Sequence, residues 1–446
     1  MTEQSESAPV DAWPRLMPAA AIAAVAILVA VLVLNRLGNG DVCSANEAVE
    51  GVFVQQMVEH DAILFPVENR SVPMYKPPLF HWTALAIDRI SGMRKVTAFN
   101  LRLPSALYAL AGAVIAMLFA YRILGVAGAV LAGLTLAGSY QYVVLGRFGR
   151  VDMTLCFFET LALFAFLLWL PRDSGVAGKQ ARSESNVPAL YLMAIAMGLG
   201  VLAKGPVGAI IPGAAIAIFM IVEGRWAQIV TLLDPGALML GGALASSWYV
   251  ACYFGGQFGF LNRQLGAENL GRFFGALGAM APWYYVKPAL LNSAPLSLLV
   301  PFAAIYALVA QAPSDSTSSG ISDAAGATRA MRLFAIFYIV TVVFFSLAAY
   351  KRRAYLLPVW PAAAVMLAWW IRSAPASWRR SATWGFAALC CGLAVFNFVH
   401  IPSYELNDCL DDSFRRAAAD ISRAVAASEP LYLFGFKDEP APLLFY

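Results

Sequence analysis

Long apolar blocks alternate with short polar islands along this chain. A helix of about 17–25 apolar residues can cross the hydrocarbon core of a bilayer, and by that length the chain holds about eleven candidate spans. They cover residues 16–35, 103–121, 125–145, 153–171, 187–203, 205–222, 235–254, 288–312, 333–350, 354–371 and 381–399. The pattern therefore predicts an all-α, polytopic membrane protein.

We expect this protein to have two unequal parts. Residues 1–400 would form the transmembrane domain, in which residues 36–102 make a first loop outside the membrane, and residues 401–446 would form a short soluble tail. No internal repeat relates one half of the apolar blocks to the other.

Composition agrees with the pattern. Of the 446 residues, 60% are hydrophobic and 13% are charged, and a soluble domain would carry roughly twice that charged fraction. The net charge of +4 does not point to nucleic acid. The six cysteines show no metal-binding spacing. These values argue against a soluble enzyme, a nucleic-acid-binding protein and a cysteine-based zinc site.

The alternation of spans distributes the polar islands between two faces. With the N-terminus inside, the outer face receives residues 36–102, 147–152, Lys204, 255–287 and 351–353. The inner face receives ordinary connectors, including a serine-rich stretch at 313–329. Ionisable residues at the ends of spans commonly mark a site or a pathway. The sequence therefore predicts a functional site on the outer face.

The first loop is predicted to carry two amphipathic helices, one over residues 46–60 that lies on the membrane surface and a second over residues 79–91. Between them, Lys76 stands directly before Pro77 and Pro78, in a connector that prolines stiffen. One interpretation is a structural cap whose lysine extends to lipid headgroups. The other is a lysine held in place for a ligand.

Clustered cations and carboxylates beside a membrane suit a lipid that carries an anionic phosphate. A phosphate leaving group needs its charge stabilised, which Lys and Arg can do. An acceptor hydroxyl needs a base, commonly a carboxylate. The combination indicates glycosyl transfer from a polyprenyl-phosphate sugar.

Five segments, in order, resemble the GT-C glycosyltransferases. They read NEAVEGVFVQQMVEHDAILFPVENRSVPMYKPPLFHW, GRVDMTLCFFETLALFAFL, LAKGPVG, ENLGRF followed by PWYY, and FFSLAAYKRRAYLLPVWPA. The resemblance extends over roughly residues 15–370. It is strongest to bacterial relatives of the lipid A aminoarabinose transferase and to the protein O-mannosyltransferases.

The resemblance implies an inverting transferase of the bacterial inner membrane whose active site, including the first loop, faces the periplasm. Its partners would be a polyprenyl-phosphate-linked sugar, membrane lipids, and an acceptor lipid, glycan or protein, with no nucleic acid. A flippase or transporter of a lipid-linked sugar is the main alternative, although such proteins commonly show paired halves. An inactive relative that binds the lipid is a further alternative.

Site residues follow from the matching positions. The family's first loop opens with an Asp-Glu pair whose aspartate is its best candidate for the catalytic base. Here the pair reads Asn46-Glu47, and asparagine cannot accept the proton, so Glu47 is the first candidate for the base and Asp152 the second. The candidates for binding the donor phosphate are Lys76, Lys204, Arg272, Arg147 and Lys351. The secondary candidates are Asn46, Glu50, Tyr75, Glu268 and Tyr355.

Two departures from the family pattern affect these expectations. Asn46 and Tyr75 stand where the family is often acidic, so a divalent metal is a cofactor that the resemblance raises but these residues do not favour. The family usually continues into a larger soluble C-terminal portion, so the tail over 401–446 is expected to be a shortened version.

Overall fold

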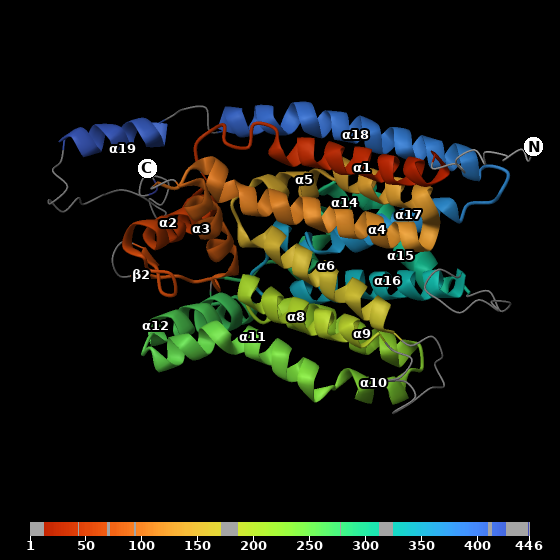
Figure 1. Cartoon of the computed structure of the whole chain (residues 1–446), viewed down its shortest axis with the longest axis horizontal. Coiled ribbons are helices and arrows are strands. Elements are labelled where there is room, and N and C mark those ends of the chain that lie inside the picture. Colours follow the sequence, from red (N-terminus) through yellow and green to blue (C-terminus); the bar gives the residue numbers. More distant parts are fainter. Residues whose placement is uncertain are drawn as a thin grey trace, which may run out of the picture.

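A computed structural model of the chain describes residues 13–42, 44–68, 72–92, 95–170, 186–276, 278–311, 324–408, 413–424 and 445. Its long helices run side by side, and a group of shorter helices covers one end of the bundle (Figure 1). The helices of the bundle are α1 (Trp13–Leu34), α4 (Ala98–Gly138), α5 (Tyr140–Arg147), α6 (Val151–Trp169), α8 (Val187–Lys204), α9 (Val207–Val222), α11 (Pro235–Phe254), α15 (Leu296–Val309), α16 (Ala324–Leu347), α17 (Val359–Arg372) and α18 (Arg379–Asp408). The other elements are α2 (Ala45–His60), β1 (Val67–Glu68), β2 (Val72–Pro73), α3 (Leu79–Ser91), α10 (Trp226–Leu232), α12 (Phe258–Leu261), the π-helix η1 (Asn262–Gly271), α13 (Arg272–Phe274), η2 (Pro282–Tyr285), α14 (Val286–Leu291), η3 (Arg353–Leu356) and α19 (Ser413–Ala424).

The all-α membrane architecture is confirmed, whereas the count of about eleven spans is not. Within the described residues, six helices are long and apolar enough to cross a membrane, or seven if the bent pair Pro282–Leu291 and Leu296–Val309 is one span. Three shorter apolar helices, Ala19–Leu34, Val207–Val222 and Val359–Arg372, accompany them. Part of the difference comes from helix breaks inside the apolar blocks, such as the 107° bend in the pair.

Helix α4 folds back on itself at Gly125. This residue has φ +67° and ψ −165°, a backbone conformation that glycine reaches without steric cost. A Cβ added at Gly133 would lie 2.4 Å from the sulfur of Met117, although a straight helix would separate the two residues by about 24 Å. The two halves of α4 therefore pack against each other, as separate spans over 103–121 and 125–145 would.

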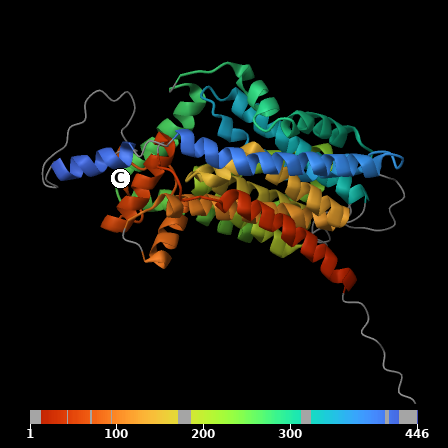
Figure 2. The ribbon, with the colours of Figure 1, turned by 90° about the horizontal axis from the view of Figure 1, so that it is seen from above.

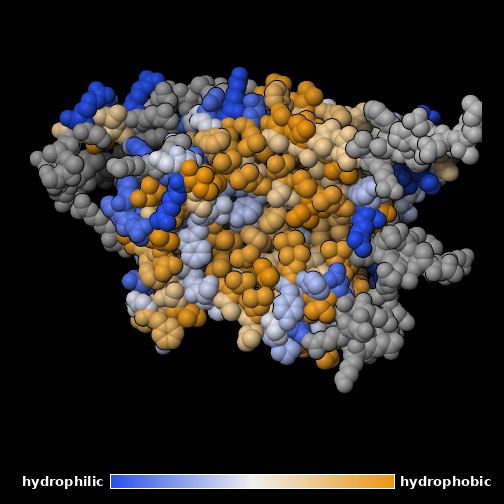
Figure 3. All heavy atoms as spheres, in the orientation of Figure 1, coloured by the Kyte–Doolittle hydropathy of each residue, from blue (hydrophilic) through white to orange (hydrophobic). Residues whose placement is uncertain are grey.

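The sides of the bundle are apolar. Figure 3 shows hydrophobic side chains over the middle of the molecule, with most hydrophilic ones toward its ends. Phe302, Val309 and Val399 are each more than half exposed on long helices. Because exposing so many large apolar side chains to water is unfavourable, this surface fits a lipid environment. The protein is a multi-pass membrane protein.

Aromatic stacking and small residues hold the bundle together. The rings of Phe119 and Phe164 stack at 4.4 Å, and Phe334 packs against both. Between α8 and α9, a Cβ added at Gly208 would lie 2.2 Å from the carbonyl carbon of Gly200. Such close approach of two backbones is typical of helix packing in membranes.

The first loop forms most of the cap at one end of the bundle (Figures 1 and 2). The two helices expected in it are present as α2 and α3. Buried residues of α3 follow the helical spacing of an amphipathic helix. The expectation that residues 46–60 lie amphipathically on the membrane surface is wrong, because α2 is buried on nearly every side from Glu47 to Gln55. It is packed in a second apolar cluster with α3 and with Trp248 of α11.

The division at residue 400 stays a prediction. Helix α18 continues past it to Asp408, and α19 follows. Within the expected tail over 401–446, the structure also describes Phe445, whose ring is buried against α2 near Gly51.

Candidate active site

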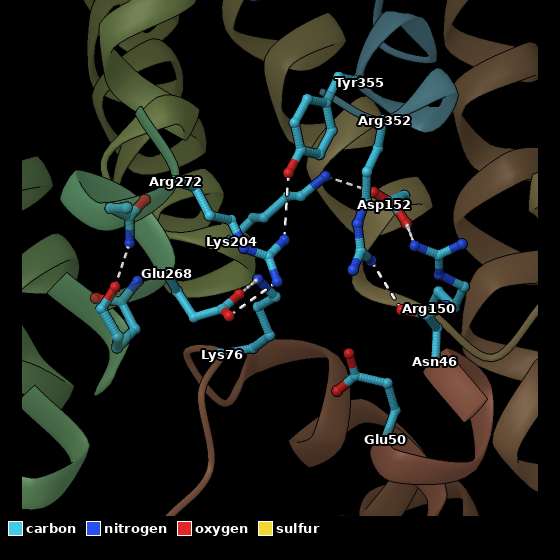
Figure 4. A network of polar contacts seen from close by, with 12 residues as sticks. Asn46, Glu50, Lys76, Arg150, Asp152, Lys204, Glu268, Arg272, Arg352 and Tyr355 are labelled. Atoms are coloured by element: carbon cyan, nitrogen blue, oxygen red, sulfur yellow. Dashed lines mark hydrogen bonds and ion pairs between the residues drawn. The ribbon is translucent and has the colours of Figure 1, made fainter. Parts of the chain in front are cut away.

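Three cations from distant parts of the chain meet at the capped end of the bundle (Figure 4). Lys76 Nζ lies 2.7 Å from Glu268 Oε2, and an Arg272 guanidinium nitrogen lies 2.8 Å from Glu268 Oε1. Lys204 forms an ion pair with Asp152 close by. Asp152 Oδ2 also lies 3.1 Å from an Arg150 guanidinium nitrogen.

Local structure explains how each side chain is presented. Lys76 is fixed by the two prolines that follow it and lead into α3. Lys204 is the last residue of α8, which ends at Gly205 with φ +97°. Asp152 lies in the first turn of α6, where the partial positive charge of a helix N-terminus favours a carboxylate. Glu268 and Arg272 are four residues apart on η1 and α13.

Aromatic and amide groups complete the cluster. The hydroxyl of Tyr355 accepts a hydrogen bond from Arg272 at 3.3 Å, and its ring centre lies 4.7 Å from Lys204 Nζ. Arg352 donates to Asn46 Oδ1 at 2.8 Å. Figure 4 shows these side chains converging from the cap and from the bundle.

The ion-paired set carries an excess of positive charge. Its four cations, Lys76, Arg150, Lys204 and Arg272, face two carboxylates, Asp152 and Glu268. An excess of this kind attracts a multivalent anion, since charge-assisted hydrogen bonds from Lys and Arg are the strong ones for phosphate oxygens.

Perturbed proton affinities reflect this crowding. Burial lowers the pKa of Lys76, and the nearby Arg272 lowers it further, while Glu268 opposes both. Burial would raise the pKa of Glu268, but Lys76 and Arg272 outweigh it and the pKa is lowered. Burial likewise acts to raise the pKa of Tyr355, and Lys204, Arg272 and Lys76 together bring it below the usual value. The cluster thus favours the anionic forms of Glu268 and Tyr355 and disfavours the cationic form of Lys76.

An apolar pocket of about 510 Å³ adjoins the cations. Its polar end is formed by Lys76, Lys204, Glu268, Arg272 and Tyr355. Most of its remaining wall is aliphatic or aromatic, with residues such as Val207, Ile210, Phe273, Phe344 and Phe345. A charged end joined to a long apolar wall matches a lipid with an anionic head.

A second pocket of about 410 Å³ has a more polar wall. Asn46, Gln141, Arg150 and Arg352 contribute to it. Tyr350 lines both pockets.

Comparison with known proteins shows a match to one family model and to the folds of solved structures. Residues 75–253 match the family model described as dolichyl-phosphate-mannose-protein mannosyltransferase. The fold is similar to that of ArnT from Cupriavidus metallidurans bound to undecaprenyl phosphate, with a TM-score of 0.76 and 18% identity, covering 98% of this chain and 85% of that one. It is also similar to the oligosaccharyltransferase AglB from Archaeoglobus fulgidus in complex with an inhibitory peptide and a dolichol-phosphate, with a TM-score of 0.55 and 13% identity over 94% of this chain and 59% of that one. The chain therefore shares the fold of these two proteins, and a segment of it matches the mannosyltransferase family model.

Two proteins that are described as uncharacterized also match this chain. One from Aquifex aeolicus is 24% identical over 350 residues, which are 78% of this chain and 63% of that protein. A second from the same organism is 22% identical over 315 residues, 71% of this chain and 64% of that protein. The chain thus spans just under two thirds of the length of these relatives.

The predicted grouping of polar islands on one face of the protein is confirmed in space. Ion pairs or hydrogen bonds join Lys76 to Glu268, Asp152 to Lys204, and Asn46 to Arg352. Each pair connects two islands that alternation of the spans had placed on the outer face. The roles of these residues stay predictions.

Glu47, the first candidate for the catalytic base, lies outside this network. Both of its carboxylate oxygens accept hydrogen bonds from Arg102, at 2.8 and 3.1 Å, and Gly149 N–H donates to Oε1 at 2.8 Å. The side chain is 1% exposed. This geometry favours a structural role for Glu47, and its catalytic role stays an untested prediction.

Arg147 and Lys351 also stand apart from the cluster. Arg147 donates to the carbonyls of Leu32 and Asn35, and Lys351 donates to the carbonyl of Met280 at 3.2 Å. Neither is among the described residues that line the larger pocket. Contacts of this kind connect segments of backbone, so the geometry does not favour phosphate binding by these two residues.

Tyr75 replaces the acidic residue expected beside the lysine. Its ring centre lies 5.0 Å from Lys76 Nζ and 5.4 Å from the Arg263 guanidinium, which are cation–π distances. Burial and the charge of Glu50 raise the pKa of its hydroxyl, so Tyr75 stays neutral.

Metal binding gains no support from the donor set. Among the described residues, no group of three or more His, Cys, Asp or Glu side chains could hold a metal ion. Glu268, the acid nearest to Lys76, uses both oxygens on cations.

Three residues that sequence reasoning left out of the candidate site belong to it. Arg150 pairs with Asp152, Arg352 contacts Asn46, and Tyr350 lies between the guanidinium groups of Arg272 and Arg352, 5.2 and 5.6 Å from its ring centre. Their signal was adjacency, since each neighbours a candidate in the segments GRVD and YKRRAY.

Proposed function

We propose that the protein transfers a sugar from a polyprenyl-phosphate donor to an acceptor of the cell envelope, at the periplasmic face of the bacterial inner membrane. The observation that carries this proposal is the group formed by Lys76, Lys204 and Arg272 at the polar end of an apolar pocket. The group would hold the donor phosphate while the apolar wall holds its lipid tail.

The chemistry follows from the charges. When the bond between the sugar and the phosphate breaks, negative charge develops on the phosphate oxygen that leaves. Preorganised Lys and Arg side chains stabilise such charge, typically by factors of roughly 10²–10³ in rate for each donor. A single displacement at the anomeric carbon inverts its configuration.

The solved neighbours support a lipid-linked donor. ArnT was captured with undecaprenyl phosphate, and AglB with a dolichol-phosphate and a peptide. The smaller pocket, which shares Tyr350 with the larger one, is where we place the acceptor. An acceptor with anionic groups would suit its two arginines, Arg150 and Arg352.

The first test compares the envelope lipids, glycans and proteins of cells with and without this protein by mass spectrometry. A mass difference of one sugar identifies both the sugar and the acceptor. Purified protein in nanodiscs should then bind undecaprenyl phosphate, and Lys76→Ala should weaken that binding, whereas Lys287→Ala, at an exposed lysine outside the cluster, should leave it unchanged. An unchanged envelope together with no binding of this lipid would remove the proposal. Movement of the lipid-linked sugar between leaflets without transfer would identify a flippase instead.

A further inference from the structure

Glu50 is a buried carboxylate with one unused oxygen. Its Oε2 lies 2.7 Å from His81 Nε2, and the residues are 3% and 0% exposed. In the described part of the chain, no hydrogen bond reaches Oε1. Figure 4 shows this carboxylate pointing toward the space between Lys76 and Asn46. Lys76 lines the larger pocket and Asn46 the smaller one.

The other carboxylates near the site are engaged or enclosed. Glu47 is held by Arg102 and Gly149, Asp152 by Lys204 and Arg150, and Glu268 by Lys76 and Arg272. Glu159 makes no hydrogen bond with the described residues, but it is completely buried. Among these described carboxylates, Glu50 alone keeps an oxygen that no cation or N–H holds and points toward the space between Lys76 and Asn46 (Figure 4), although it is not among the residues that line the two pockets.

The surroundings of His81 determine which of its ring nitrogens carries the proton. Its Nδ1 is buried without a hydrogen-bond partner in the described structure, and the rings of Phe53 and Phe80 pack edge-on against the imidazole. A proton on Nδ1 would be a buried, unsatisfied donor, at a cost of about 1–3 kcal/mol. The neutral imidazole therefore carries its proton on Nε2 and donates it to Glu50 Oε2. This contact holds Oε2 in place and leaves Oε1 as the oxygen without a hydrogen bond in the described structure.

We propose that Glu50 is the general base of the transfer reaction and that His81 is the residue that positions it. The proposal rests on the proposed function. The acceptor hydroxyl gives its proton to Glu50 Oε1 as its oxygen forms a bond to the anomeric carbon. The bond between that carbon and the phosphate oxygen breaks, and its electron pair leaves with the polyprenyl phosphate. Glu50 then releases the proton to water.

Glu50 lies on the same face of α2 as Asn46. Asn46 and Glu50 are four residues apart on α2, so they lie on one face, one turn from each other. The resemblance to the GT-C family puts the base at Asn46, which cannot accept a proton. A carboxylate one turn along the same face can reach the same region of the site.

The test separates binding from chemistry. Glu50→Gln should bind undecaprenyl phosphate like the wild type but transfer sugar roughly 10²–10⁴ times more slowly, the usual contribution of a general base. Adding Asn46→Asp to that variant restores a carboxylate one turn away and should recover at least part of the rate. Glu59→Gln, at an exposed glutamate of the same helix, is the matched control and should transfer normally. His81→Phe should slow transfer without weakening lipid binding, and His81→Gln, which keeps an N–H donor, should recover part of the loss.

The outcomes distinguish the assignment of Glu50 as the base from the proposed function on which it rests. Transfer is measured with the donor and acceptor that the envelope comparison identifies, and binding with undecaprenyl phosphate. If the wild type transfers sugar and Glu50→Gln does so at the same rate, Glu50 is not the base although the proposed function stands. The same follows if Glu50→Gln loses transfer and lipid binding together and Asn46→Asp recovers neither. If the wild type transfers no sugar to any envelope component, the proposed function fails and the assignment of the base fails with it.

Discussion

Replacing Glu47 by Gln should destabilise the fold more than it affects the chemical step. The change keeps the shape but puts an amide N–H₂ where one carboxylate oxygen now accepts from Arg102 at 2.8 or 3.1 Å. Removing one partner of a buried ion pair costs about 3–5 kcal/mol, because the other charge is left uncompensated. Arg102 also donates to the carbonyls of Leu37, Asn39 and Asp41. These bonds remain, so we expect a loss near the lower value, about 3 kcal/mol.

The measurement is the free energy of unfolding in detergent micelles, followed by tryptophan fluorescence. A double-mutant cycle with Arg102→Met separates the pair from its surroundings, and the coupling should be about 2–3 kcal/mol. Glu59→Gln provides the control for a glutamate on the same helix. If Glu47→Gln unfolds like the wild type but abolishes transfer, the structural interpretation is refuted and Glu47 is the base that the sequence predicted.

Three further predictions concern the lipid site. Lys76→Ala should lower the rate of transfer by roughly 10²–10³, as initial rates can show. Because Glu268 keeps its ion pair with Arg272 in this variant, its charge is not left uncompensated, and a melting curve should show a smaller loss of stability than for Glu47→Gln. Because burial lowers the pKa of Lys76, the side chain loses its charge at a lower pH than a free lysine does. Affinity for undecaprenyl phosphate should therefore fall as the pH rises, and Lys76→Arg should keep this affinity to a higher pH. A pH titration of lipid binding can show both effects. Ile210→Trp should fill the apolar pocket and weaken binding of the long lipid about tenfold, or about 1.4 kcal/mol, with a smaller effect on a short isoprenyl phosphate; equal effects on both lipids would argue against a tail site there.

Sequence reasoning succeeded where a local pattern decides the structure. The apolar blocks located the long helices, and the helices over 46–60 and 79–91 appear as Ala45–His60 and Leu79–Ser91. Alternation across the membrane also put the right islands on one face, because it depends only on the order of the spans. Lys76 and Lys204 were found since a lysine at such a place in an apolar chain is unusual in itself.

Pairing between distant residues was beyond local patterns. Nothing in the residues around Glu47 shows that Arg102, 55 positions away, takes its carboxylate. The contact of Glu50 with His81 joins α2 to α3 across 31 positions, and neither residue has an unusual sequence context. The surface helix expected at 46–60 was wrong for the same reason, because its burial depends on α3 and α11, which pack around it. The three shorter apolar helices and the bent pair depend on breaks in the helical backbone, which hydropathy alone does not predict.

Under the proposed function, the two pockets that share Tyr350 also determine the order in which the substrates bind. The larger one is bounded by α9, η1 and α16, and the smaller one takes its wall from α2, α5 and η3. A lipid donor and its acceptor could therefore enter by separate routes, and neither must depart before the other arrives. Such an enzyme would pass through a complex of three molecules instead of alternating between two half-reactions. Each pocket would then be blocked by its own class of inhibitor while the other pocket still binds its substrate.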